Sequence, residues 1–131
     1  MPRVCWPLLN GRPRIEVVLT LALDGKESPR NLLADTGAGS TSSAFDLVLD
    51  ENDCMMCGNY MGMTSLGGAF SGSFPIYGVR VRIPLLGLDL DVRAVGVPTT
   101  PTGLDGIAGF RFLNRFTYGN FGDKGQFGIE S

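Results

Sequence analysis

The stretch Leu32-Leu33-Ala34-Asp35-Thr36-Gly37-Ala38 decides how the rest of the chain is interpreted. It places one carboxylate directly after an apolar run, on a turn whose small residues take up little space. We expect the two leucines to lie in a buried strand, which carries Asp35 into a region of low dielectric where neighbouring groups tune its proton affinity. Gly37 has no Cβ, so a second backbone can approach closely, and the Thr36 hydroxyl can hydrogen-bond to a neighbouring chain. The stretch therefore predicts an aspartate placed for chemistry.

This stretch resembles the catalytic loop of aspartic peptidases, and its single short copy is most similar to that of the retropepsin family. Residues 65–72, Ser-Leu-Gly-Gly-Ala-Phe-Ser-Gly, resemble the mobile flap hairpin that closes over substrate in that family, although an ordinary flexible loop has the same composition. Residues 106–113 resemble the apolar-apolar-glycine segment that packs beneath the catalytic loop and precedes the terminal helix. These segments follow one another in the order of the family, over residues 15–116.

The resemblance implies an all-β, closed barrel of the pepsin and retropepsin type with one short C-terminal helix, as a single domain over residues 1–131. It also implies an aspartic endopeptidase that hydrolyses peptide or protein substrates. That mechanism needs two carboxylates sharing one proton, and the chain has one Asp-Thr-Gly, so we expect a homodimer in which the two copies of Asp35 meet on the two-fold axis. The charged aspartate would activate a water and the neutral one would donate to the peptide carbonyl.

The site residues implied by the family fall into three groups. The catalytic residue is Asp35, supported by Thr36, Gly37 and Ala38, with the Thr36 hydroxyl bonded across the subunit interface. The flap and substrate-binding residues are Leu66, Gly67, Gly68, Ala69 and Phe70, to which an extended peptide would add as a strand. The support beneath the catalytic loop comes from Ile107, Ala108 and Gly109.

One feature departs from the family pattern. Retropepsins commonly carry an aspartate soon after the loop alanine and an arginine directly after the late glycine, and these two pair. Here the first position is occupied by Gly39-Ser40-Thr41 and the second by Phe110, with Arg111 shifted by one residue. Because both partners are changed together, no single charge is left buried without its partner. We therefore expect the fold to persist and the network that stabilises the dimer to differ.

Composition supports carboxylate chemistry by exclusion. The 131 residues are 44% hydrophobic and include 19 glycines and 8 prolines, which favours short strands joined by tight turns over a helical bundle. No histidine is present, which excludes hydrolases that need an imidazole base and histidine-rich zinc sites. The net charge is −2 and lysines and arginines form no run, so we expect neither a nucleic-acid nor a membrane partner, and no cofactor or metal.

The cysteines and the N-terminal segment bear on location. Cys5, Cys54 and Cys57 are an odd set, which argues against a secreted disulfide framework. No apolar run has membrane-spanning length, and residues 1–9 are too short and too interrupted for a secretory signal. We expect a cytoplasmic protein with reduced thiols.

Hydrophobic periodicity predicts most of the strands. Alternation over residues 14–24 ends in Asp24-Gly25, a hairpin dipeptide, and residues 31–34 form the returning strand. A second pair, residues 77–83 and 86–93 with a turn at 84–87, should place arginines and aspartates opposite one another in solvent. Further expectations are a strand at 45–49, with a helix starting after Ser42 or Ser43 as the alternative, a loop at 97–103, a helix at 110–116 and a terminal strand within 121–130.

Several motifs have a simpler interpretation beside the functional one. Asp35 could cap a turn through its own backbone, and Gly37-Ala38-Gly39 imitates a dinucleotide fingerprint without its third glycine. Cys54-Met55-Met56-Cys57 could be a zinc half-site or redox pair, but free or partly buried thiols fit better. Residues 50–53 are acidic without the spacing of a calcium loop, which indicates a solvated turn. The rival functions are a non-catalytic binding or assembly domain of the same fold, and a small β-barrel binding module.

Overall fold

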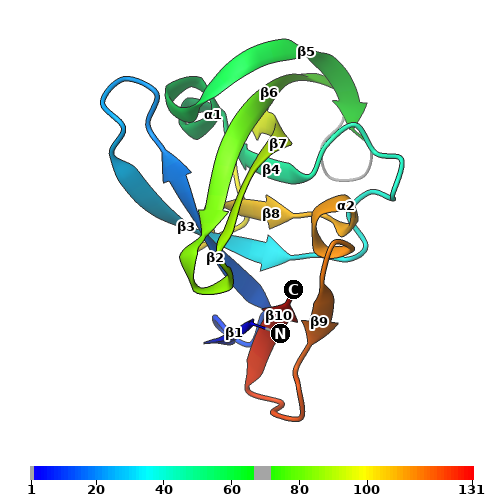
Figure 1. Ribbon diagram of the computed structural model, residues 1–131. Helices are drawn as coiled ribbons and strands as arrows, with labels where there is room; N and C mark the ends of the chain where they lie inside the picture. Colours follow the sequence, from blue (N-terminus) through cyan, green and yellow to red (C-terminus); the bar gives the residue numbers. More distant parts are fainter. Residues whose placement is uncertain (1, 67–71) are drawn as a thin grey trace.

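The computed structural model describes residues 2–66 and 72–131 and is built mainly from strands (Figure 1). The strands are β1 (Arg3–Pro7), β2 (Arg14–Thr20), β3 (Glu27–Ala34), β4 (Leu47–Asp50), β5 (Gly58–Leu66), β6 (Gly72–Ile83), β7 (Leu88–Val97), β8 (Gly106–Ala108), β9 (Thr117–Gly119) and β10 (Gln126–Glu130). The helical segments are α1 (Glu51–Cys57), the 3-10 helix Pro84–Leu86 and α2 (Phe110–Leu113). The prediction of a mostly β chain is confirmed.

Six of the strands close into a barrel, in the order β2-β3-β8-β4-β7-β6. Closure occurs where β2 pairs with β6, with Val18 opposite Arg82 and Leu19 opposite Val81. Strand β5 pairs with the first part of β6, from Leu66 opposite Gly72 to Gly58 opposite Val79. The parallel pairs β3–β8 and β4–β7 lie within this otherwise antiparallel barrel. The sequence-based prediction of a closed barrel is thus confirmed.

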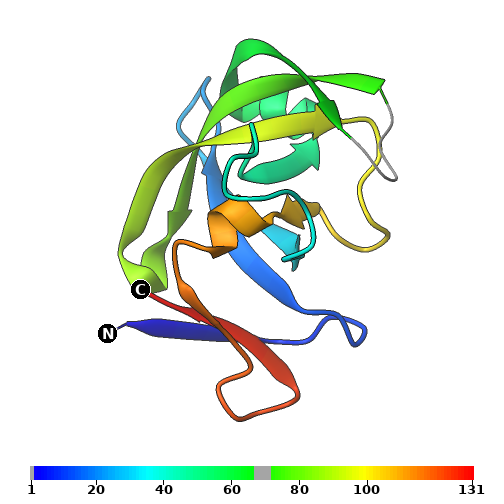
Figure 2. The same cartoon turned by 90° about the vertical axis from the view of Figure 1, so that its right-hand side faces the viewer.

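The two ends of the chain form a separate three-stranded sheet in the order β1-β10-β9. Strands β1 and β10 pair over five residues, from Arg3 opposite Glu130 to Pro7 opposite Gln126. Figures 1 and 2 both place this sheet beneath the barrel, with the two termini close together. The predicted terminal strand is therefore present, and it pairs within its own chain.

The barrel interior is filled by the alternating apolar residues that the sequence pattern singled out. Every second residue of β2 is fully buried, and the same holds for the inner face of β6. On the outer face Arg80 and Arg82 lie opposite Asp91 and Asp89, and the Arg80 guanidinium binds Asp89 at 2.6 and 2.7 Å. The predicted turn at 84–87 is a 3-10 helix that ends at Gly87 with φ of 65°.

Other expected boundaries are wrong. Strand β2 ends at Thr20, because the chain turns at residues 21–26, where Gly25 has φ of 72° and its amide donates to Leu21 O. The strand expected at 45–49 is present as β4, but it begins two residues later, at Leu47. Helix α2 covers only four residues, because the hydrogen bonds after it tighten to a three-residue spacing, with the Arg115 amide donating to Phe112 O and the Phe116 amide to Leu113 O.

The acidic residues 50–53 are not the predicted solvated turn. They begin helix α1, whose N-terminus is capped by the Asp50 side chain accepting from the Asn52 amide at 2.9 Å. Asp53 is buried to 8% exposure because the Arg30 guanidinium pairs with both of its carboxylate oxygens, at 2.7 and 2.8 Å. The expectation of one short helix is therefore corrected to two α-helices within the described residues.

Among residues 2–66 and 72–131, the longest helix is far too short to cross a bilayer.

Candidate active site

Asp35 follows directly after β3, at the point where this strand leaves the barrel. The preceding residues pair in parallel with β8, with Leu32 opposite Gly106 and Ala34 opposite Ala108. The register continues one residue further, since the Asp35 amide donates to Ala108 O at 3.0 Å. Leu32 is fully buried, as expected for an apolar strand inside the barrel. The backbone of Asp35 is thereby fixed by the barrel, while its side chain is half-buried at the surface.

The Asp-Thr-Gly segment forms a tight turn. The Gly37 amide donates to Asp35 Oδ1 at 3.0 Å, and the Ala38 amide donates to Asp35 O at 3.1 Å. No residue among 2–66 and 72–131 donates to Asp35 Oδ2 or accepts from the Thr36 hydroxyl. Thr36 and Gly37 are exposed. The turn therefore orients the carboxylate and leaves one of its oxygens without a partner among the described residues.

The segment after β8 supports this turn from beneath. The Phe110 amide donates to Ala38 O at 2.9 Å, and the Gly109 amide donates to Asp46 O at 2.9 Å. A Cβ atom added at Gly109 would lie 2.9 Å from Ala38 O, so that no larger residue fits without a shift. The predicted support residues Ala108 and Gly109 thus contact the Asp35 turn through the backbone.

A small apolar cluster joins the turn to the hairpin of β5 and β6. Ala38 and Leu66 pack, partly buried, against a buried group that includes Ile107. Val48, Ile76, Val95 and Val97 complete the buried group. The structure therefore brings together one residue from each of the three predicted groups.

The glycine-rich hairpin can be described only at its base. Strands β5 and β6 pair up to Leu66 opposite Gly72. The other predicted flap residues, Gly67, Gly68, Ala69 and Phe70, lie outside the described residues. Leu66 is thus the one member of the predicted flap set that the structure locates.

Asp46 is a central residue of this region that the sequence reasoning missed. It is 1% exposed, and its carboxylate accepts from the Arg93 amide at 3.0 Å and from Arg115 Nη2 at 2.8 Å. Arg111 Nε lies 3.7 Å from the same carboxylate. The charged pair expected to be lost is thus replaced by Asp46 with two arginines. A signal existed in the sequence: a single acid before the apolar run of β4, and arginines four residues apart after Gly109.

The Cys-x-x-Cys motif lies in α1 and is buried. Cys54 is 0% and Cys57 8% exposed, and both are free thiols. Burial, with the nearby Asp53 carboxylate as a second cause, raises the pKa of Cys54 to about 12, and burial also raises the pKa of Cys57. In the described part of the chain no three His, Cys, Asp or Glu side chains are grouped to hold a metal.

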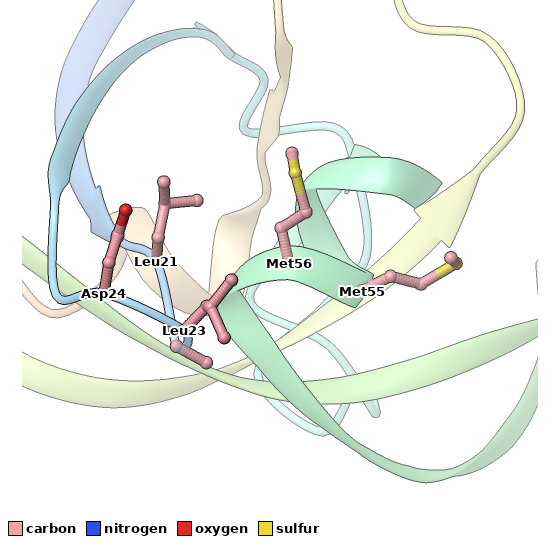
Figure 3. A pocket seen from close by; sticks show the side chains of 6 residues that line it. Leu21, Leu23, Asp24, Met55 and Met56 are labelled. Atoms are coloured by element: carbon pink, nitrogen blue, oxygen red, sulfur yellow. The ribbon is translucent and has the colours of Figure 1, made fainter.

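An apolar cavity lies at the other end of β3. It measures about 410 Å³ and is formed between the turn after β2 and helix α1 by Leu21, Ala22, Leu23, Asp24, Met55 and Met56 (Figure 3). The Ala22 amide donates to Met56 O at 2.9 Å and holds the two walls together. Asp24 is the one ionisable side chain in its lining, and it belongs to the turn before β3, whereas Asp35 follows the strand. This cavity is therefore separate from the candidate catalytic turn.

Comparisons with protein-family models, with curated proteins and with solved structures found no match to this chain.

Proposed function

We propose that this protein is a retropepsin-like aspartic endopeptidase, active as a homodimer. The observation that carries the proposal is the Asp35 turn. Its backbone is held to Ala108 by the barrel, one carboxylate oxygen is held by the Gly37 amide, and the other has no partner among the described residues. A carboxylate that is oriented but not neutralised is suited to hold and activate a water.

The second carboxylate has to come from a second copy of the chain. A pepsin-type mechanism needs two aspartates sharing one proton, and the sequence has a single Asp-Thr-Gly. An isologous interface around Asp35 brings two identical turns together, and the exposed Thr36 hydroxyl is then the donor that binds the partner's turn. Activity should fall at both ends of the pH range, because the pair works only with one proton bound.

Asp35→Asn is the test of this function. It keeps the size and the turn-forming oxygen of the side chain but removes the charge, so we expect turnover of an unbiased peptide library to fall by about 10³-fold or more with the fold retained. Asp24→Asn is a matched control, because Asp24 Oδ1 also accepts an amide two residues on, from Lys26 at 3.0 Å. Asp24→Asn should leave turnover unchanged.

Sedimentation of the same samples tests the dimer. We expect peptidase activity to follow the dimer fraction as protein concentration is lowered. A strict monomer without peptidase activity would instead support a binding or assembly domain. A turn role for Asp35, as in a small β-barrel binding module, predicts that Asp35→Asn changes stability and leaves function intact.

A further inference from the structure

We propose that a cavity between the Asp35 loop and helix α2 binds the carboxylate of an acidic peptide segment. The cavity measures about 200 Å³ and is lined by Thr41, Arg111, Asn114 and Arg115. Each of these side chains carries at least one N–H or O–H donor, and none carries a negative charge. The lining therefore matches an anion that accepts several hydrogen bonds.

The two arginines are held in place from behind by a buried acid. Arg115 Nη2 lies 2.8 Å from Asp46 Oδ1, and Arg111 Nε lies 3.7 Å from the same oxygen. Arg111 Nη1 also donates to Ser43 O at 2.6 Å. Because these contacts order the guanidinium groups before any ligand arrives, binding does not have to immobilise two long side chains. The site is preorganised.

The charge balance indicates a ligand with one negative charge. Two guanidinium groups against the single Asp46 carboxylate leave one positive charge at the cavity. Each guanidinium has five N–H groups, and the contacts with Asp46 and Ser43 use only part of them. A carboxylate neutralises this charge and matches the planar fork of arginine, whereas a phosphate dianion would exceed it.

The position of the cavity connects it to peptide recognition. Thr41 is six residues after Asp35, so the two lie no more than about 21 Å apart along the chain, and the Phe110 amide ties α2 to Ala38 of the same loop at 2.9 Å. A peptide that crosses Asp35 in an extended conformation reaches the cavity within a few residues. This step rests on the proposed peptidase function. Given that function, the preferred substrates carry an acidic residue several positions from the cleaved bond.

Binding is measured without any need for turnover. The probe is a blocked pentapeptide with a central glutamate between glycines, titrated against the Asp35→Asn protein while the arginine Nε–H signals are followed by NMR. We expect the Arg111 and Arg115 signals to shift and to saturate at peptide concentrations on the order of millimolar. The peptide with glutamine in place of glutamate should cause no shift. A third peptide, with its C-terminal carboxylate free and no glutamate, distinguishes a terminal carboxylate from an acidic side chain as the natural ligand.

A pair of variants tests the assignment. Arg111→Gln leaves the Arg115–Asp46 contact in place and should weaken binding at least about tenfold. Arg12→Gln is the control, since Arg12 is also half-buried and also donates to a backbone carbonyl, that of Thr102. Arg12→Gln should change the affinity for the glutamate peptide by no more than about twofold.

Two outcomes of the binding experiment would by themselves overturn the anion site. These are shifts that never saturate, or equal weakening in both variants, which would mean general charge screening. Failure of the proposed function is seen separately, because an inactive wild-type protein can still bind the peptide. Conversely, an active enzyme that cleaves glutamate and glutamine peptides equally, and binds neither in the titration, would remove the anion site and leave the peptidase standing.

Discussion

The Asp-Thr-Gly turn and the Cys-x-x-Cys helix are the two motifs of this chain that suggest chemistry, and the structure treats them in opposite ways. At the turn, Asp35 is half-buried and has an oxygen without a partner among the described residues. In α1, Cys54 and Cys57 are buried against the barrel. The difference teaches that a motif can act only where the fold leaves its reactive atom accessible.

The largest expected effect is on the reactivity of Cys54. A pKa raised from 9.0 to about 12 reduces the thiolate about 10³-fold at neutral pH, and the thiolate is the nucleophile. Iodoacetamide should therefore modify Cys54 at least about 10³-fold more slowly in the folded protein than in urea, as followed by mass spectrometry of the peptide that contains it. Comparable rates in the two states would show that α1 opens readily, and the contrast with the turn would be lost.

Asp46→Asn tests the Asp35 turn, which is the other motif of the comparison. We expect it to loosen the contacts that support this turn. The substitution removes the charge that holds Arg115 and Arg111, so we expect a loss of about 2 kcal/mol in the free energy of unfolding by urea. Asp89→Asn is the matched control, because Asp89 also pairs with an arginine but lies on the exposed face of the barrel. The melting temperature of the control should hardly change. Equal losses in both variants would mean that burial does not distinguish the two pairs.

Gly109→Ala tests the same support through the backbone. The new Cβ would lie 2.9 Å from Ala38 O, and the loop has to move to relieve this contact. We expect a loss of about 1–2 kcal/mol in unfolding free energy, together with weaker peptidase activity, because the Asp35 turn is displaced. Gly125→Ala provides the control, since its nearest atom is a flexible side-chain oxygen, Asp123 Oδ1, at 3.3 Å. If Gly109→Ala were as stable as this control, the turn would tolerate movement.

Period-2 patterning was sufficient to predict several strands of the barrel, because strands with one buried face show it directly, whereas closure into a barrel was implied by the family resemblance. β2, β6 and β7 were predicted from their alternation, and the position of Asp35 after β3 followed from the apolar run before it. Helix α1 was not predicted, although Asp50 is a local N-cap signal, because the acidic residues 50–53 also fit a solvated turn and the burial of Asp53 depends on a long-range partner, Arg30.

Asp46 was missed for a similar reason. Its three partners come from β7 and from the region of α2, which are distant in sequence. A buried charge is explained only by the groups that surround it, and pairing of strands far apart in the chain brings those groups together. The candidate catalytic residue and the support from Ala108 and Gly109 could thus be predicted from local motifs, whereas the buried charge of Asp46 was not.

The smallest expected effect concerns stability at alkaline pH. A thiol whose pKa is higher in the folded than in the unfolded chain keeps its proton on folding, so this contribution is complete below about pH 9 and is lost as the pH rises towards 12. The free energy of unfolding of the wild-type protein should therefore fall more steeply above pH 9 than that of Cys54→Ser, by up to about 1.4 kcal/mol for each pH unit. Urea unfolding at pH 7 and pH 10 measures the difference, and comparison within each variant cancels the cost of the substitution itself. Parallel slopes would mean that Cys54 ionises in the folded chain as it does in the unfolded one, and burial in α1 would then not protect this thiol.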